Sequence, residues 1–157
     1  MDVLSRRIML LLVAATVLLP SRMPAQELDQ YGKSRSWKGP SGHYRLIDFA
    51  AAWCQPCWKA LPRLQSFADN QPSVRVIVVS VDERPQGRDK LVKLLGLTVP
   101  VLWDEEHRVA EHYSPAGMPA TFLLDPSGEV VYEHVGSGDR EWNEMIDFIE
   151  SALGDSP

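Results

Sequence analysis

Hydrophobic and polar positions follow one another along the chain in patterns that predict strands and helices in turn. Residues 74–81 (VRVIVVSV) are rich in β-branched side chains, which is typical of a buried strand. Near the C-terminus, apolar residues recur at helical spacing from Trp142 to Leu153, which predicts a strongly amphipathic helix. The expected strands are 44–50, 74–81, 99–103, 120–124 and 130–135, and the expected helices are 56–70, 88–95, 106–113 and 141–153.

This order of elements predicts an α/β fold. Early alternation of strand and helix implies parallel βαβ units, and Asp125-Pro126-Ser127-Gly128 between the last two strands is a hairpin signal that adds an antiparallel pair. We therefore expect one domain over residues 43–154, with a mixed parallel and antiparallel central sheet and helices on both faces. The length of 157 residues leaves room for about one such domain.

The first 25 residues predict a targeting segment. Arg6 and Arg7 precede an uncharged apolar run at 8–19. As a helix this run is roughly 18 Å long, well short of the 30 Å or so of a membrane's hydrocarbon layer. A cleaved signal peptide of an exported, periplasmic protein fits best. The alternative is an uncleaved N-terminal membrane anchor, because Met23-Pro24-Ala25 is an imperfect cleavage site.

Residues 26–42 and the overall charge complete this outline. The segment 26–42 is polar and punctuated by Gly, Ser and Pro, which predicts a tether or an irregular first stretch and no packed element. The net charge is −5, and no run of Lys or Arg is present. We therefore expect no nucleic-acid partner, because phosphates require a concentrated basic face.

The chemistry is concentrated in Trp53-Cys54-Gln55-Pro56-Cys57, where the first strand gives way to the first long helix. The positive end of a helix and its unpaired N–H groups stabilise a thiolate, so Cys54 is expected to be the attacking sulfur. Cys57, one turn further along, is expected to resolve the mixed disulfide. Pro56 suits an early helical position because it has no N–H to lose.

A structural disulfide and half of a metal site are the alternatives for this pair. A metal site requires further ligands, and the chain has no second CxxC or CxH motif. The four histidines, His43, His107, His112 and His134, are scattered along the sequence. An export signal together with a βαβ context favours a redox-active pair that needs no bound cofactor.

With these motifs in order, residues 43–153 resemble the thioredoxin-fold superfamily, and within it the exported TlpA-like thiol-disulfide oxidoreductases. Pro62 lies where that family carries a proline inside the helix, and 83–104 is similar to the helix and strand that TlpA-like proteins insert. The resemblance implies a three-layer thioredoxin-like fold. It also implies that Pro119 follows a cis peptide bond, and that Met118 and Pro119 bind an extended client segment beside Trp53 and Pro56.

Asp48 lies six residues before Cys54, where thioredoxins carry a buried aspartate that assists proton transfer at the resolving cysteine. Burial would raise its pKa toward neutrality. Strand alternation allows a second reading, with Asp48 on a solvated face and Ile47 and Phe49 inside. Many TlpA-like reductases instead have Glu at the position of Ala60 and Asn at that of Asp48. We therefore hypothesise that the acidic group has moved to the thioredoxin position.

The resemblance implies an exported enzyme that acts on client proteins with disulfides or thiols, more often as a reductant than as an oxidant. Electrons would come from a membrane or periplasmic dithiol donor. Cytochrome c maturation is one process that such proteins serve, and we expect the enzyme to act as a monomer. A disulfide-forming oxidase remains an alternative. A copper chaperone is another, with Cys54 and Cys57 as ligands and Met118 as a third.

Overall fold

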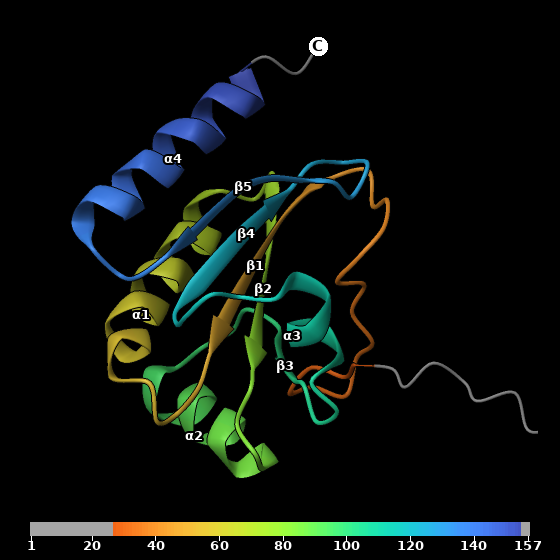
Figure 1. Ribbon diagram of the computed structural model, residues 1–157, viewed down its shortest axis with the longest axis vertical. Coiled ribbons are helices and arrows are strands. Elements are labelled where there is room, and N and C mark those ends of the chain that lie inside the picture. The colour runs from red at the N-terminus through yellow and green to blue at the C-terminus, as the bar shows by residue number, and fades with distance from the viewer. Residues whose placement is uncertain (1–26, 155–157) are drawn as a thin grey trace, which may run out of the picture.

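The computed structural model describes residues 27–154, whose elements alternate between strand and helix (Figure 1). Each predicted element is confirmed, with ends that differ by at most three residues from the predicted ones. The elements are β1 (Tyr44–Ala50), α1 (Gln55–Asn70), β2 (Val74–Ser80), α2 (Pro85–Leu95), β3 (Val101–Trp103), α3 (Arg108–Tyr113), β4 (Ala120–Leu124), β5 (Val130–Val135) and α4 (Asp139–Gly154).

The five strands form one mixed sheet in the order β3-β2-β1-β4-β5. The first three strands run parallel, whereas β4 is antiparallel to both β1 and β5. The turn between β4 and β5 is held by Asp125, whose side chain accepts hydrogen bonds from the backbone N–H groups of Ser127 and Glu129. The predicted mixed sheet and its hairpin are therefore confirmed.

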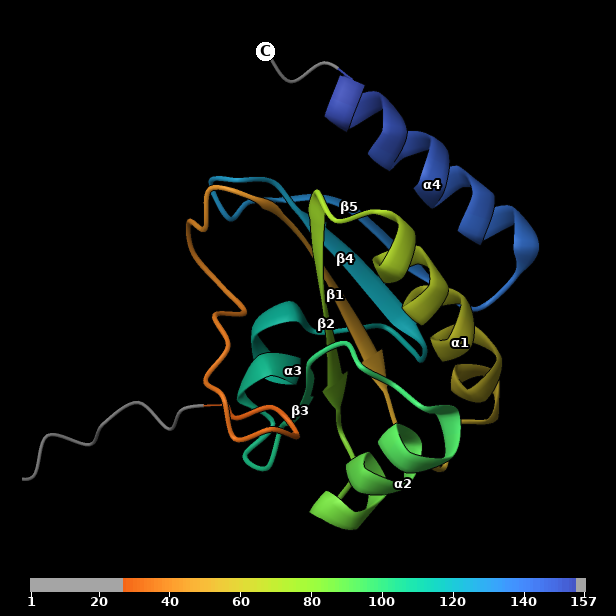
Figure 2. The ribbon, with the colours of Figure 1, turned by 180° about the vertical axis from the view of Figure 1, so that it is seen from behind.

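The central strand β1 is buried on both faces. Leu46 and Ala50 pack in one core with α1, α2 and α4, whereas Ile47 and Phe49 pack in a second core with α3. Figures 1 and 2 show these helices on the two sides of the sheet. The result is three layers, and the first of the two cores contains both cysteines.

The region 83–104 adds a helix and a strand, as the resemblance implied. Strand β3 extends the sheet beyond β2, and α2 packs its buried Leu91 into the first core. This helix ends at Gly96, whose φ of 63° is a left-handed conformation that costs glycine little. The start of α2 lies near the loop that carries the cysteines, because Gln86 and Gly87 line a pocket together with Trp53.

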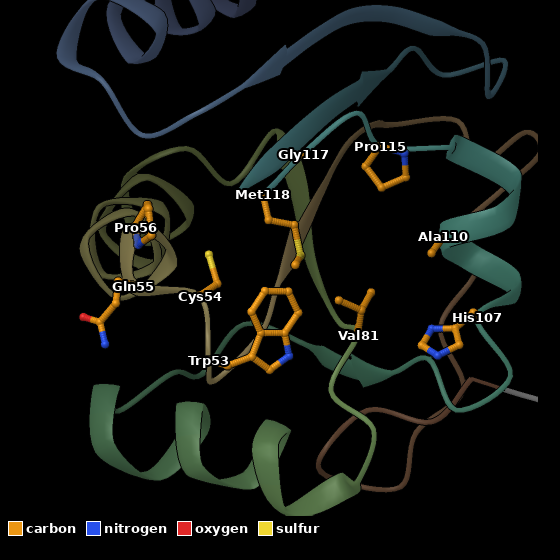
Figure 3. A pocket seen from close by; sticks show the side chains of 10 residues that line it. All are labelled: Trp53, Cys54, Gln55, Pro56, Val81, His107, Ala110, Pro115, Gly117 and Met118. Atoms are coloured by element: carbon orange, nitrogen blue, oxygen red, sulfur yellow. The ribbon is translucent and has the colours of Figure 1, made fainter.

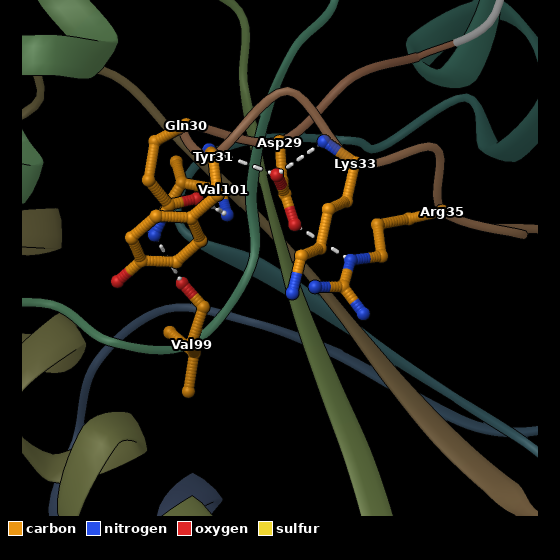
Figure 4. A network of polar contacts seen from close by, with 7 residues as sticks. All are labelled: Asp29, Gln30, Tyr31, Lys33, Arg35, Val99 and Val101. Atoms are coloured by element: carbon orange, nitrogen blue, oxygen red, sulfur yellow. Dashed lines mark hydrogen bonds and ion pairs between the residues drawn. The ribbon is translucent and has the colours of Figure 1, made fainter.

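The prediction that residues 26–42 form no packed element is wrong, because residues 27–42 pack against the sheet (Figure 4). Asp29 is buried, accepts hydrogen bonds from the N–H groups of Tyr31 and Lys33, and pairs with Arg35 at 2.6 Å. The neighbouring Gln30 side chain binds two backbone groups beside β3, the carbonyl of Val99 and the N–H of Val101.

The second half of the same segment is fixed by a buried arginine on β1. Arg45 donates hydrogen bonds to the carbonyls of Ser36, Lys38 and Gly39, while Trp37 is buried against α3 in the second core. A few anchoring side chains thus hold a polar stretch in place, which its average composition does not reveal. The predicted leader, residues 1–25, lies outside the described residues, and within 27–154 no helix has the length and apolarity to cross a membrane.

Candidate active site

Cys54 and Cys57 form a disulfide at the N-terminus of α1. Cys54 is the N-cap residue, and its Sγ atom accepts a hydrogen bond of 3.3 Å from the backbone N–H of Cys57. Pro56 occupies the first turn, where its missing N–H costs no helical hydrogen bond. The sulfur of Cys54 therefore lies where helical N–H groups and the helix dipole favour negative charge.

The two sulfurs differ in their access to the surface. Cys54 lines an open groove of about 720 Å³, together with Pro56, whereas Cys57 is 0% exposed and belongs to the first core. A partner molecule in the groove can reach Cys54 and cannot reach Cys57. This asymmetry matches the predicted order of attack and resolution.

The groove has mainly apolar walls (Figure 3). Trp53 is 64% exposed and lies in the middle of the groove beside Met118, with Val81 next to them. The far wall is formed by residues of α3 and its flanking loops: His107, Ala110 and Pro115. An apolar, open groove of this kind suits a polypeptide segment better than a small charged molecule.

The loop before β4 separates this groove from the interior. The Met118–Pro119 peptide bond is cis. Met118 lines the groove, whereas Pro119 is buried beneath it and its carbonyl accepts a hydrogen bond of 2.8 Å from the N–H of Gly136. Of the predicted binding residues, Trp53, Pro56 and Met118 therefore share one groove with Cys54, and Pro119 supports it from below.

Asp82 is a residue that the sequence analysis missed. Both of its carboxylate oxygens accept hydrogen bonds from the N–H of Ala52, at 3.0 and 3.1 Å, and the carboxylate also accepts one from Ser80. The Ala52 carbonyl is bound in turn by the indole N–H of Trp58. These contacts fix the loop that leads to Cys54. Asp82 lies two residues after the end of the parallel strand β2, and the carboxyl ends of such strands commonly carry site residues.

Trp58 therefore does not extend the exposed surface of Trp53. It is half-buried, packs against the first core and uses its N–H for the active-site loop. The structure favours packing, and Trp53 alone presents an indole to the groove.

Asp48 is buried on the same face of β1 as Leu46 and Ala50, beneath α1, and is 3% exposed. Its Oδ1 accepts a hydrogen bond of 2.7 Å from the hydroxyl of Thr121. Burial raises the pKa of Asp48 to about 7, although the Thr121 hydrogen bond works in the opposite direction. The solvated alternative for this residue is excluded, because helices cover both faces of β1.

Asp48 also lines a small cavity of about 10 Å³ under α1. Ala60 lines the same cavity, and Ala60 and Cys57 lie three residues apart on one face of α1. The buried carboxyl is thus placed under the helix about one turn from the resolving sulfur. Within residues 27–154 no group of three or more His, Cys, Asp or Glu side chains gathers in a way that could hold a metal ion.

The sequence matches the AhpC/TSA family over residues 20–133. It is 31% identical over 112 residues to sporulation thiol-disulfide oxidoreductase A of Bacillus subtilis, which covers 66% of this chain and 68% of that protein. It is 29% identical over 98 residues to thiol-disulfide oxidoreductase ResA of Geobacillus kaustophilus, which covers 61% of this chain and 56% of that protein. The chain therefore spans little more than half the length of that ResA.

The fold is similar to that of StoA from Bacillus subtilis, with a TM-score of 0.66 and 27% sequence identity. The superposition covers 76% of this chain and 92% of the StoA chain. Both curated relatives are named for thiol-disulfide chemistry. The paired sulfurs at the N-terminus of α1 are the groups in this chain that can carry out that chemistry.

Proposed function

The chain belongs to the AhpC/TSA family of thioredoxin-fold proteins, and from this premise we propose that it is a thiol-disulfide oxidoreductase that reduces disulfides of exported client proteins. The observation that carries the proposal is the unequal access of the two sulfurs. Cys54 faces an open groove at a helix N-terminus, and Cys57 lies in the core behind it. The cysteine pair is itself the redox group, with no further cofactor.

The reaction begins with the reduced pair. The thiolate of Cys54 attacks one sulfur of the client disulfide, forms a mixed disulfide and releases the other client sulfur as a thiolate. Cys57 then loses its proton and attacks the sulfur of Cys54, which frees the second client thiolate. The client has gained two electrons and the enzyme is left with the Cys54–Cys57 disulfide, the form seen in this structure.

Asp48 is the proton acceptor for Cys57 in this scheme. A carboxyl group with a pKa of about 7 is present in both protonation states near neutral pH, as an acid/base group needs to be. Asp48 lies under α1, about one turn from Cys57, and is therefore better placed than bulk water to take the proton from the buried thiol, because Cys57 has no exposed surface.

The groove binds the client. Trp53 offers an exposed indole for an apolar side chain, and the backbone beside Met118 is placed to pair with an extended segment. Clients are thus protein segments with accessible disulfides, and the haem-site cysteines of exported c-type cytochromes form one such class. The enzyme acts as a monomer.

Export places the enzyme in an oxidising compartment. The leader at 1–25 directs this export and is then either cleaved off or kept as a membrane anchor. A reductase in such a compartment has to be re-reduced after every cycle. We therefore expect a second partner, a dithiol electron donor in or beyond the membrane, that docks on the same groove when the cysteines are oxidised.

A trapping experiment tests the order of attack. Cys57→Ser should accumulate a mixed disulfide between Cys54 and a client cysteine, because the resolving thiol is missing. Cys54→Ser should accumulate none, since Cys57 is buried. A stable adduct through Cys57, or none in either variant, would contradict the proposed mechanism.

The reduction potential tests the direction. A glutathione titration followed by tryptophan fluorescence, to which Trp53 and Trp58 beside the pair contribute, should give a reduction potential near or below about −250 mV, in the range of thioredoxin. A value near about −120 mV, in the range of strong oxidants, would make the protein a disulfide donor. Stoichiometric Cu(I) binding that resists a chelator would instead favour a copper chaperone.

A further inference from the structure

Two buried polar atoms beneath α1 have no hydrogen-bonding partner among the described residues: Oδ2 of Asp48 and Nδ1 of His134. Both residues line the same cavity of about 10 Å³. Unpaired buried polar atoms are costly, and a cavity of roughly this size is the smallest that holds one water molecule. One water molecule in this cavity would give both atoms a hydrogen-bonding partner.

The register of the sheet brings the two residues together. Asp48 is directly opposite Thr121 on β4, and Thr121 is directly opposite His134 on β5. Residues in register share a face of the sheet, so all three side chains lie on the side covered by α1 and α4. Two strand spacings separate the backbones of Asp48 and His134 by roughly 10 Å, which two side chains and one water can bridge.

Thr121 leaves one carboxyl oxygen for this bridge. Its hydroxyl donates to Oδ1 of Asp48 at 2.7 Å, so Oδ2 remains for a partner in the cavity. On the other side, the imidazole of His134 is partly buried, with Nδ1 inside. A single water can donate to one of these atoms and accept from, or donate to, the other.

We propose that one water molecule in this cavity links Oδ2 of Asp48 to Nδ1 of His134, and that His134 is the proton partner of Asp48. The proposal rests on the proposed function, since it extends the proton path of the resolving step. When Cys57 loses its proton to Asp48, the proton moves through the water to Nδ1 of His134. His134 is a positioning residue, because it acts through Asp48 and does not touch the sulfurs.

The charged groups around His134 come from several elements. Burial lowers the pKa of His134 below its ordinary value, and Glu141 and Glu144 of α4 and a backbone interaction with Gly136 offset this effect only in part. Arg63 of α1 also lines the cavity. Its charge is paired with Asp139 of α4 at 2.8 Å. Tyr132 packs beside His134 on β5, with ring centroids 5.9 Å apart. A neutral imidazole near pH 7 is able to accept the proton.

Titration by NMR of the oxidised protein tests the pair without any activity assay. In Asp48→Asn the titration midpoint of His134 should fall, and in His134→Gln that of the Asp48 carboxyl should rise. Each change removes an opposite charge, so one coupling energy lies behind both shifts. We expect a shift of up to about 1 pH unit, the value for unit charges ~10 Å apart at an effective dielectric constant of ~24.

His43→Gln is the matched control, because His43 is exposed and lies outside the cavity. This change should leave the Asp48 titration where it is in the wild type. Midpoints of Asp48 and His134 that stay unchanged in His134→Gln and Asp48→Asn would overturn the proposal.

The second readout is the rate at which Cys57 resolves a mixed disulfide, measured against pH. His134→Gln should slow this step about tenfold near pH 7 and change its pH profile, while His43→Gln should not. An unaltered rate and profile in His134→Gln would overturn the role of His134, even if the titrations were coupled. A wild type that exchanges no thiols would instead contradict the proposed function, and the titrations would still decide whether the pair exists.

Discussion

Asp48 on β1 and Ala60 on α1 line the same small cavity beneath the active-site helix. In the TlpA-like proteins that this sequence resembles, the position of Ala60 often holds Glu and that of Asp48 often holds Asn. The shared cavity means that an acid at either position would enter the same space under α1. The structure thus gives a physical basis for the hypothesis that the acidic group has moved from the helix to the strand.

Removing this acid should slow thiol exchange. We expect Asp48→Asn to reduce the rate of the resolving step on the order of 100-fold at pH 7, because positioned acid/base groups contribute at least that much. Ala60→Glu, which adds a second acid to the same cavity, should change the rate less. Stopped-flow tryptophan fluorescence measures both rates. Equal rates for the wild type and Asp48→Asn would contradict the role given to Asp48.

The double variant Asp48→Asn/Ala60→Glu tests the exchange of positions directly. If both side chains reach the same cavity, the double variant should resolve the mixed disulfide at least about tenfold faster than Asp48→Asn. Ala60→Gln in the same background is the matched control, since Gln has the same size and cannot take up a proton. Recovery with Gln as large as with Glu would show that filling the cavity, and not the acid, matters.

Asp48 also predicts how stability depends on pH. Its pKa is about 7 in the folded protein against an ordinary value of 3.8, because burial disfavours the charged form. Between these two values the unfolded chain has released the proton and the folded protein still holds it. The free energy of unfolding therefore falls as pH rises from about 4 to 7, by roughly 4 kcal/mol at most, and levels off above pH 7.

Urea unfolding of the oxidised protein at several pH values measures this slope. Asp48→Asn should flatten it between pH 4 and 7, because the titrating group is gone. Glu150→Gln removes an exposed acid on α4 and is the control that should keep the slope. A slope that survives in Asp48→Asn would mean that other groups cause it.

Periodicity predicted the helices and strands well but left open which face of its strand Asp48 occupies. The apolar run at 74–81 defines a strand whichever face each residue takes. On β1, which is buried on both faces, the alternation of Ile47, Asp48 and Phe49 does not say which side the carboxyl faces. Only the pairing of β1 with β4 and the packing of α1 decide it.

Contacts between distant segments were likewise beyond the sequence. Asp29 and Trp37 are buried, but the stretch around them is polar on average, and residues 27–42 were therefore predicted to be a tether. His134 joins the cavity through the register of β4 and β5, and Asp82 reaches Ala52 across two strand ends. In contrast, Cys54 and Cys57 were found at once, because their spacing and the helix start are local features.

Asp82 should prove necessary for the order of the loop before Cys54. Asp82→Ala leaves the buried N–H of Ala52 without its acceptor, which costs about 1–3 kcal/mol. Hydrogen exchange at the Ala52 amide should speed up accordingly, more than at amides of β4. Asp89→Ala, which removes an exposed acid on α2, is the control. Unchanged protection of Ala52 in Asp82→Ala would contradict this assignment.

Trp53 should govern the reduction of protein clients and not the intrinsic reactivity of the pair. Its indole is 64% exposed in the groove, so its loss removes contact area without leaving a hole in the core. Trp53→Ala should lower kcat/KM for an unfolded disulfide-bonded protein about tenfold, a loss of about 1.4 kcal/mol in transition-state binding. The rate with a small aromatic disulfide and the reduction potential should change little.

Trp58→Phe is the control for the neighbouring indole, because Trp58 supports the loop through Ala52 and should affect both substrates alike. An equal loss for the protein and the small disulfide in Trp53→Ala would mean that Trp53 tunes the cysteines and does not bind clients.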